Sequence, residues 1–336
     1  MVLTVKILLL NEQDMKKVFT MEDAIKADKD ALKFYSKGET CIPLRTNLAV
    51  PEHNGQSLYM PGYVAGANAL GIKIISVYPD NINKGIPTVP AFMVLVDNKT
   101  GQVCAAMDGT YLTKVRTGAL AGAATDILAR KDSEIYALIG TGGQAETHLE
   151  AVLTVRNIKE VRVYSRNRER VEGFVERMRE IYSERFKVNI VAATSSDEAV
   201  KDADIITCVT TSKEPVFDGK LIKKGVHING MGSYTPDMQE LDEYVVLNSD
   251  KIYVDTLDGV LNESGDFIIP MKEKKFSEED ITGELGQVII GEIPGRERED
   301  EITLFKSVGS GVFDLVTARR IYEKAIGMGI GQMVEF

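Results

Sequence analysis

The stretch Glu134-Ile-Tyr-Ala-Leu-Ile-Gly-Thr-Gly-Gly-Gln-Ala-Glu-Thr-His-Leu-Glu150 decides the fold of this chain. Its apolar run before the glycines is short enough for a buried strand, and a helix-like run follows the glycines. Between the two, Gly140, Gly142 and Ala145 have the spacing G-x-G-x-x-A, which in this context is typical of a dinucleotide-binding turn. The first glycine permits the turn, the second lets a pyrophosphate approach the backbone, and the alanine lets helix and strand pack closely. A plain turn between strand and helix is the alternative, because glycines are common there.

Length and composition limit the kind of protein this can be. A chain of 336 residues suits two domains, and 44% apolar with 27% charged residues is ordinary for a globular protein. The net charge of -10 argues against nucleic-acid binding and, more weakly, against an anionic membrane surface. The apolar stretch Val2–Leu10 is too short to span a bilayer.

Cysteines and histidines are too few and too scattered for a metal site or a disulfide framework. Cys41, Cys104 and Cys208 lie far apart, which points to a reducing compartment such as the cytoplasm. The three histidines show no ligand spacing, so we expect no protein-bound metal.

The first third of the chain and the segment near its C-terminus predict an α+β domain. Residues 11–37 have the pattern of one or two helices, with a capping box at Thr20. Extended segments then predict a sheet made largely of sequential strands; they are 44–50, 57–60, 71–78 and 91–97. A helix is expected over 108–129, and a closing helix over 314–325 should pack back on this domain.

From Ser133 onward, strands and helices alternate. Strands are expected at 135–139, 161–165, 188–192, 205–210, 226–230, 251–255 and 302–307, and helices at 144–155, 168–185, 195–201 and 278–290. Alternation of this kind implies parallel pairing. We therefore predict an α/β protein with a doubly wound Rossmann sheet in residues 121–310, and a second, α+β domain formed by 1–120 with 311–336.

The end of the second Rossmann strand determines which nicotinamide cofactor fits. An NAD site places Asp or Glu there, but here the strand ends in Val163-Tyr-Ser-Arg-Asn-Arg168 without an acid. Ser165, Arg166 and Arg168 could hydrogen-bond and neutralise a 2′-phosphate, and Asn167 lies between the two arginines. The pattern favours NADPH over NADH; the alternative is that these basic residues simply begin a solvated helix.

The fourth strand ends in Val209-Thr-Thr-Ser212, which carries three hydroxyls in a row. In open α/β sheets this edge faces the ligand crevice. Thr210 and Thr211 are therefore candidate cofactor contacts, although such hydroxyls also satisfy backbone groups in turns.

Hydride chemistry needs orientation, charge stabilisation and a proton source from the protein. Lys73 sits in the apolar segment Gly71-Ile-Lys-Ile-Ile-Ser76, and a lysine desolvated in this way has a lowered pKa and can donate a proton. Arg45 and Arg116 could hold a carboxylate bidentately. Taken singly, each cation is more often a surface or salt-bridge residue, and spacing alone does not show that the three meet.

Several segments resemble the ornithine cyclodeaminase/mu-crystallin family and run in order through nearly the whole chain. They are Met60-Pro61, Gly71-Ile-Lys73, Gly85-Ile-Pro-Thr88, Met107-Asp-Gly-Thr110, Lys114-Val-Arg-Thr-Gly-Ala119, Ile139-Gly-Thr-Gly-Gly-Gln-Ala145, His227-Ile-Asn-Gly-Met-Gly-Ser233, Gln239-Glu-Leu-Asp242 and Phe305-Lys-Ser-Val-Gly309. The resemblance implies a homodimer whose first domain binds the substrate and forms the dimer contact around a central Rossmann domain. It also implies that Arg45, Lys73 and Arg116 line the substrate site near the nicotinamide. The cofactor contacts that it implies are Thr117, Thr141, Gly142, Gly143, Gln144, Ser165, Arg166, Thr210, Met231 and Val308.

Two departures place the chain within that family. Ornithine cyclodeaminases carry an acidic residue where this chain has Ser233, and a glutamate just before the Met-Pro pair, where this chain has Leu58-Tyr59. Losing both acids removes the obvious base for ammonia loss or water attack. Ser233, together with Asn262-Glu-Ser-Gly-Asp266, is similar to mu-crystallin and other ketimine reductases.

The resemblance therefore implies NAD(P)H-dependent reduction of cyclic imino acids, Δ1-pyrroline-2-carboxylate to L-proline and Δ1-piperideine-2-carboxylate to L-pipecolate. In this interpretation Lys73 is the catalytic residue, and Arg45, Lys73, Arg116 and Ser233 bind the substrate. One alternative is an ornithine cyclodeaminase or alanine dehydrogenase. The other is a non-catalytic, crystallin-like ligand-binding protein.

Overall fold

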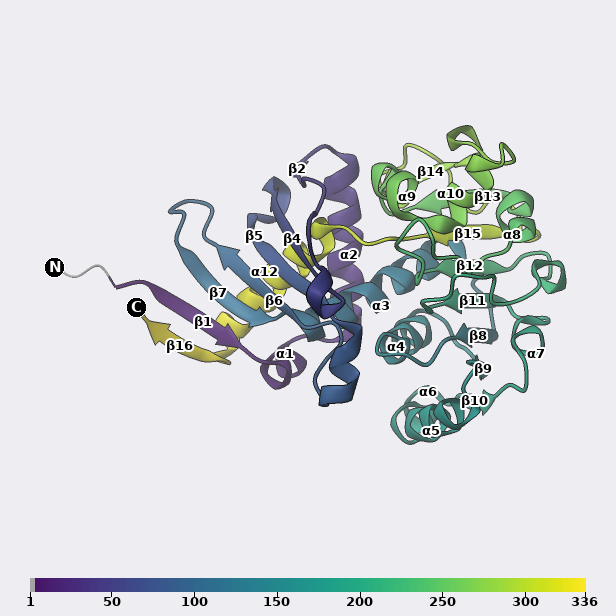
Figure 1. The fold of residues 1–336 in the computed structure, drawn as a ribbon, viewed down its shortest axis with the longest axis horizontal. Coiled ribbons are helices and arrows are strands. Elements are labelled where there is room, and N and C mark those ends of the chain that lie inside the picture. The colour runs from purple at the N-terminus through teal and green to yellow at the C-terminus, as the bar shows by residue number, and fades with distance from the viewer. Residues whose placement is uncertain (1–3) are drawn as a thin grey trace. The chain divides into compact units, whose positions relative to one another are not determined.

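The computed structural model describes residues 4–336 and divides the chain into two compact units (Figure 1). Unit 1 comprises Met1–Arg116 and Ser310–Phe336, and unit 2 comprises Thr117–Gly309. Val2 and Leu3 of the apolar N-terminal stretch lie outside the described residues. None of the helices within 4–336 combines the length and the apolar character that crossing a membrane requires.

Unit 1 is built on one mixed sheet with the strand order β16-β1-β7-β6-β5-β4-β2, in which β3 also pairs with β4. Its strands are β1 (Lys6–Leu10), β2 (Thr40–Cys41), β3 (Thr46–Val50), β4 (Gly55–Val64), β5 (Ala69–Val77), β6 (Ala91–Val96), β7 (Val103–Asp108) and β16 (Gln332–Glu335). The strands from β4 to β7 pair with their sequence neighbours and are antiparallel, which confirms the predicted sequential sheet. Strand β1 pairs parallel with β7 and antiparallel with β16, so the two ends of the described chain meet at one edge.

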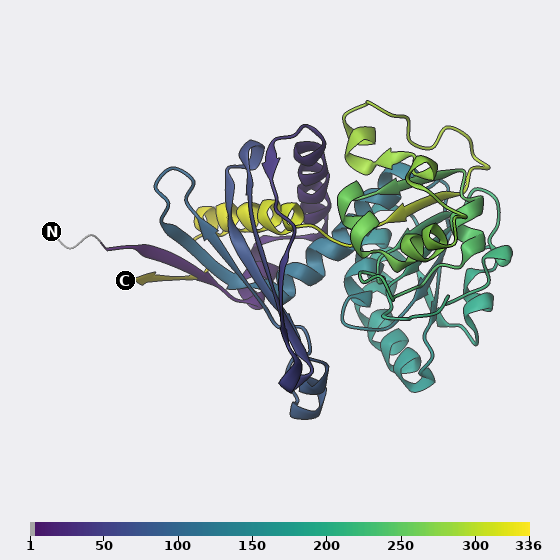
Figure 2. The same cartoon turned by 45° about the horizontal axis from the view of Figure 1, so that its top comes forward.

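Helices cover one face of this sheet, and both ribbon views show α12 lying along it (Figures 1 and 2). The helices are α1 (Glu12–Val18), α2 (Met21–Ser36) and α12 (Gly311–Met328), with 3-10 turns at Pro51–His53, Ala65–Ala67 and Pro79–Lys84. Helix α12 packs on β4, β5, β6 and α2. The predicted capping box is present, since the Thr20 side chain accepts a hydrogen bond from the Asp23 N–H. The closing helix α12 thus falls in the same compact unit as α1 and α2.

Unit 2 is a doubly wound parallel sheet with the order β10-β9-β8-β11-β12-β15-β13-β14. Its strands are β8 (Ile135–Ile139), β9 (Glu160–Tyr164), β10 (Asn189–Ala192), β11 (Ile205–Cys208), β12 (His227–Gly230), β13 (Lys251–Val254), β14 (Gly283–Glu284) and β15 (Thr303–Lys306). The predicted Rossmann fold is confirmed. The strand order reverses between β8 and β11, and such a switch point is where doubly wound sheets bind ligands.

Both faces of the unit 2 sheet are buried, because successive side chains of a strand point to opposite faces. On β8, Tyr136 and Leu138 join the apolar core under α4 (Ala145–Val155) and α5 (Arg168–Met178). Ala137 and Ile139 join the opposite core under α7 (Ser196–Val200), α8 (Glu243–Asn248), α9 (Leu257–Glu263) and α10 (Gly265–Lys272). The remaining helical pieces are α3 (Gly109–Leu128), α6 (Glu184–Phe186), α11 (Leu285–Ile289), a π turn at Arg179–Ser183, and 3-10 turns at Gly219–Leu221 and Glu278–Asp280.

Two predicted elements were wrong in part. The helix expected at 278–290 is broken, because Gly283 has φ +150° and Thr282 exchanges hydrogen bonds with Ile252 of β13. Only the short α11 remains helical beyond that point. The helix expected at 168–185 passes into the π turn after Met178. Strand β7, immediately before α3, was not predicted.

Candidate functional site

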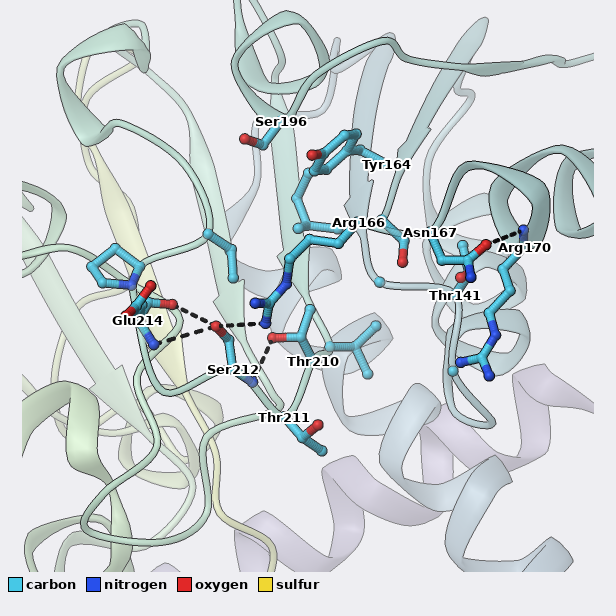
Figure 3. Close-up of a pocket in the computed structure, with 17 residues that line it drawn as sticks. Thr141, Tyr164, Arg166, Asn167, Arg170, Ser196, Thr210, Thr211, Ser212 and Glu214 are labelled. Atoms are coloured by element: carbon cyan, nitrogen blue, oxygen red, sulfur yellow. Dashed lines mark hydrogen bonds between the residues drawn. The ribbon is translucent and has the colours of Figure 1, made fainter. Parts of the chain in front are cut away.

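A cleft of about 540 Å³ lies in unit 2 at the carboxyl ends of β8, β9 and β11 (Figure 3). It therefore coincides with the switch point of the sheet. Eight of the predicted cofactor residues line it: Gly140, Thr141, Gly142, Ser165, Arg166, Asn167, Thr210 and Thr211.

The glycine turn has the shape that a pyrophosphate requires. Gly140 has φ +117°, and a Cβ there would lie 2.6 Å from the Val209 carbonyl oxygen, so glycine lets β8 approach β11. A Cβ at Gly142 would meet no atom within 4 Å, which leaves the backbone beside the cleft open. Helix α4 begins at Ala145, which is fully buried. The N-terminus of that helix and the exposed turn before it fit a phosphate group.

The basic side of the cleft is built differently from the prediction. Arg166 extends across it, and its Nη2 donates to Ser212 Oγ at 3.3 Å (Figure 3). Asn167 caps α5 by accepting from the Arg170 N–H at 3.0 Å, and Arg170 lines the cleft. Arg168 is not among the lining residues; it is paired with Glu172 at 2.9 Å and its side chain is 80% exposed. The second arginine that lines the cleft is therefore Arg170, and the cofactor contact of Arg168 stays a prediction.

Sequence reasoning also missed other lining residues, namely Tyr164, Ser196, Ser212, Glu214, Pro215 and Val216. Ser212 links the Thr210 side of the cleft to Glu214, because its N–H donates to Thr210 Oγ1 at 3.2 Å and its hydroxyl to the Glu214 carbonyl at 2.7 Å. The signal for Ser212 was present in the quoted run of hydroxyls. To predict that Arg170 lines the cleft, one must also know at which residue α5 begins, because this decides which side of the helix Arg170 occupies.

The other predicted cofactor residues lie around the cleft without lining it. Gly143, Gln144 and Ala145 continue the turn into α4. Thr117 precedes Gly118, which packs against Thr147 of α4. Met231 and Val308 are largely buried and follow β12 and β15. Their cofactor contacts stay predictions.

Ser233 is fully buried in unit 2, and its hydroxyl donates to the Met238 carbonyl at 2.9 Å. Its N–H donates to Glu240 Oε2 at 3.1 Å. The side chain therefore already serves to hold the segment 233–238, and its predicted contact with the substrate stays a prediction.

The cationic residues of unit 1 gather on a carboxylate that sequence reasoning missed. Lys73 Nζ lies 2.5 Å from Asp314 Oδ2, and Arg116 Nε lies 2.9 Å from Asp314 Oδ1. Lys73 is 1% exposed on β5, between Met60 of β4 and Met93 of β6. The packing of α12 on these strands brings Asp314 to the lysine. One buried aspartate thus bridges two of the three predicted cations.

The pKa values of this cluster are shifted by burial and by mutual charge. Burial lowers the pKa of Lys73 to about 8; Arg116 and Arg45 add to the effect, and Asp314 opposes it. Burial alone would raise the pKa of Asp314, but Arg116 and Lys73 hold it below its usual value. The part of Arg45 in the substrate site stays a prediction.

A second carboxylate, Asp28 of α2, belongs to this cluster. It is fully buried, and burial raises its pKa well above the usual value; Arg116 opposes the rise and Asp314 adds to it. Two carboxylates with pKa values driven apart are typical of functional sites. Arg116 Nη1 is buried and has no hydrogen-bond partner within residues 4–336, so it remains able to bind a carboxylate.

Both missed acids carried a sequence signal. Asp28 lies on the apolar face of α2, between Ala24 and Ala31, and Asp314 interrupts the apolar run Gly311-Val-Phe-Asp-Leu-Val316. Within 4–336, no group of three or more His, Cys, Asp or Glu side chains is placed to hold a metal ion.

Comparisons with known proteins agree with this geometry. The sequence model of the ornithine cyclodeaminase/mu-crystallin family matches residues 5–329. A Delta(1)-pyrroline-2-carboxylate reductase of Bacillus cereus is 40% identical over 329 residues, which are 98% of this chain and 100% of that protein. The structure of Thermococcus litoralis Delta(1)-pyrroline-2-carboxylate reductase in complex with NADH and L-proline has a TM-score of 0.92 and 45% identity, covering 97% of this chain and 99% of that chain. An archaeal alanine dehydrogenase dimer with bound NAD has a TM-score of 0.90 and 32% identity, covering 98% and 99%. The chain therefore belongs to the ornithine cyclodeaminase/mu-crystallin family.

Proposed function

We propose that this chain reduces the C=N bond of cyclic imino acids, Δ1-pyrroline-2-carboxylate to L-proline and Δ1-piperideine-2-carboxylate to L-pipecolate, with a reduced nicotinamide cofactor. The observation that carries the proposal is the buried cluster of Lys73, Arg116 and Asp314. Such a cluster suits a small substrate with one carboxylate and one basic nitrogen. The similar Bacillus and Thermococcus proteins, both named Delta(1)-pyrroline-2-carboxylate reductases, support the same reaction.

The side chains of unit 1 have separable roles in this reaction. Arg116, with its unpartnered Nη1, and Arg45 bind the ring carboxylate. Lys73, whose pKa is about 8, gives a proton to the ring nitrogen or keeps it protonated, which makes the imine carbon a better hydride acceptor. Asp314 fixes the positions of Lys73 and Arg116. The nicotinamide cofactor, when bound in the unit 2 cleft, supplies the hydride.

For the cofactor we propose a preference for NADPH over NADH. The support is that no acid follows β9, whereas Arg166 and Arg170 both line the cleft. Replacing Arg170 by alanine should lower kcat/KM for NADPH about tenfold or more and leave that for NADH nearly unchanged, because Arg170 would meet only the 2′-phosphate. Arg168→Ala is the matched control, since Arg168 is paired with Glu172 outside the cleft. Equal selectivity in all three proteins would refute the role of Arg170, and a wild type that does not favour NADPH would refute the NADPH assignment.

The test of the reaction itself is the loss of reduced-nicotinamide absorbance. We expect rapid loss with Δ1-pyrroline-2-carboxylate or Δ1-piperideine-2-carboxylate. Loss only with pyruvate plus ammonia would make the chain an alanine dehydrogenase, as the similar archaeal protein is named. Ammonia release from L-ornithine would make it a cyclodeaminase. Ligand binding without any turnover would leave the crystallin-like interpretation.

We also propose a homodimer that forms through unit 1. Side chains alternate between the two faces of a strand, so Phe92 of β6 lies on the face opposite to the buried Met93. Phe92 is 49% exposed, and β3, which pairs with β4 in the same sheet, and the β5–β6 connection add the exposed Leu48, Ile82 and Ile86. An apolar face of this kind supports self-association.

For location we propose the cytoplasm. All three cysteines are free thiols in the structure, with Cys41 exposed and Cys208 buried. Free thiols suit a reducing compartment. Fractionation of the cells that make the protein would test this location.

A further inference from the structure

Three segments that carry the resemblance, and in which it gave a role only to Val308, meet inside unit 2. They are Gln239–Asp242, 262–266 and Phe305–Gly309. Each contributes one charged side chain that is 0% exposed: Glu240, Asp266 and Lys306. Lys306 Nζ lies 3.0 Å from Asp266 Oδ2. Burying charged side chains costs free energy unless their partners are well placed. We therefore ask what these three side chains hold in place.

The Glu240 carboxylate joins two loops at the carboxyl edge of the sheet. Its Oε1 accepts from the Thr210 N–H at 2.5 Å, and Thr210 lines the cofactor cleft. Its Oε2 accepts from the N–H groups of Gly232 at 2.6 Å and Ser233 at 3.1 Å. A Cβ at Gly232 would lie 2.1 Å from the Thr210 carbonyl oxygen, so the two loops are also in direct contact.

The backbone of Glu240 is in turn held by hydrogen bonds to Asp266 of α10. Asp266 Oδ1 accepts from the Glu240 N–H at 2.7 Å and from the Leu241 N–H at 3.0 Å. The cleft wall attaches to the same segment, because Val216 N–H donates to the Glu240 carbonyl and Gln239 N–H donates to the Ser212 carbonyl, both at 2.9 Å. The wall that follows β11 is therefore bonded along its length to the segment that carries Glu240.

The charges that face Glu240 determine when it is ionised. Burial raises the pKa of Glu240 to about 6; Lys306 opposes the rise and Asp266 adds to it. The thiol of Cys208 also faces this carboxylate, and burial raises the pKa of that thiol well above its usual value. The pKa of Glu240 is thus set by its burial and by Asp266, which raise it, and by Lys306 and the hydrogen bonds with Thr210, which lower it.

We propose that Glu240 is a positioning residue for the dinucleotide, whose ionised carboxylate holds the Thr210 loop in the conformation that forms the cleft. Three backbone N–H donors converge on its two oxygens, so both oxygens must accept. A neutral carboxylic acid or an amide places a donor where one of these oxygens stands, and one loop must then release its hydrogen bond.

The test is the affinity of the protein for NADH without any substrate, measured by titration of nucleotide fluorescence at pH 7.5. Glu240→Gln should raise the dissociation constant roughly 30-fold, which corresponds to about 2 kcal/mol at 1.4 kcal/mol per tenfold change. Glu243→Gln is the matched control, because Glu243 lies three residues further on and its half-exposed side chain pairs with Lys275. It should bind NADH as the wild type does. Equal affinity of Glu240→Gln and Glu243→Gln would overturn the proposal.

The pH dependence separates this role from a merely structural one. Wild-type affinity for NADH should fall as pH is lowered from 7.5 through 6 to 5.5, since Glu240 then gains a proton, and Glu240→Gln should lose that dependence. His148→Gln should keep the pH dependence, because Glu240 is unchanged in that variant. The histidine of α4 is then excluded as the titrating group. If Glu240→Gln does not fold, the wild type and His148→Gln still test the proposal. An affinity for NADH that does not change with pH in these two proteins would overturn it. Turnover of an imine is not needed for any of these measurements, so failure of the proposed reaction would show separately.

Discussion

Asp314→Asn is the substitution that tests the unit 1 cluster most directly. It keeps the shape of the side chain but removes the charge that faces Lys73 Nζ at 2.5 Å and Arg116 Nε at 2.9 Å. Both cations are buried, so water cannot replace the lost anion. The pKa of Lys73 must then fall, because only the burial and the neighbouring arginines still act on it.

The size of the effect follows from the pKa of Lys73. An opposite charge within about 4–6 Å shifts a pKa by about 1–3 units, so the value of about 8 should drop to between about 5 and 7. At pH 7.5 the protonated fraction of Lys73 would fall from about three quarters to about one quarter or less. If only the protonated lysine supports reduction, kcat/KM at this pH falls at least about threefold.

The assay is kcat/KM for Δ1-pyrroline-2-carboxylate over pH 5.5 to 9.5 in both proteins. The alkaline limb should move down by at least about one pH unit in Asp314→Asn. Ionisation of the substrate acts equally on both proteins, so the difference between the two profiles is what counts. Asp30→Asn is the control, because Asp30 of α2 pairs with Arg320 in the same unit. A folded Asp314→Asn with an unmoved alkaline limb would refute the assigned coupling of Asp314 to Lys73.

Three further predictions concern stability and assembly. The pKa of His227 is lowered to about 3, mainly by burial, so the unfolded chain binds the extra proton between about pH 3 and 6.5. The contribution of neutral His227 to the unfolding free energy is thus fully present above about pH 6.5 and declines on acidification by up to about 1.4 kcal/mol per pH unit. Calorimetry should therefore show a shallower decline of stability for His227→Gln. Lys306→Met leaves Asp266 without its cation and should cost about 3–5 kcal/mol of unfolding free energy in urea, whereas Lys275→Met at the surface should leave the unfolding free energy nearly unchanged; equal losses would contradict the buried pair. Phe92→Glu should convert the proposed dimer to a monomer in sedimentation velocity, and an unchanged mass would exclude that face of unit 1 as the interface.

The Rossmann unit could be predicted because its strands are short apolar runs between turn residues. The strand at Ile135–Ile139 was predicted residue for residue. Strand β7 was missed because Val103-Cys-Ala-Ala-Met-Asp108 is made mostly of small residues, which do not separate it from the alanine-rich helix that follows. The helix at 278–290 was wrong because a tertiary contact with β13 outweighs local helical periodicity there.

The sequence predicts those site residues that are unusual in their local context, but not the distant residues that pack against them. Lys73 stands out as a charge within an apolar strand, but its partner Asp314 lies 241 residues away and is brought to it by packing alone. Of the two arginines predicted after β9, Arg166 lines the cleft, and the other lining arginine, Arg170, was not predicted. Arg168 opens α5 and pairs one turn further along with Glu172, whereas Arg170 lines the cleft. That choice depends on where the helix begins, which sequence patterns locate only to within a few residues.

The division of unit 1 into two chain segments has a consequence for synthesis on the ribosome. Unit 2 is continuous from Thr117 to Gly309 and can fold as it emerges, since domains generally fold as units. Unit 1 has to wait for the segment that follows, because α12 brings Asp314 and β16 completes the edge beside β1. A product released early would still carry the nucleotide cleft, yet its lysine would lack its counter-ion. Catalytic activity would then require a chain that has been translated beyond α12, whereas nucleotide binding would not.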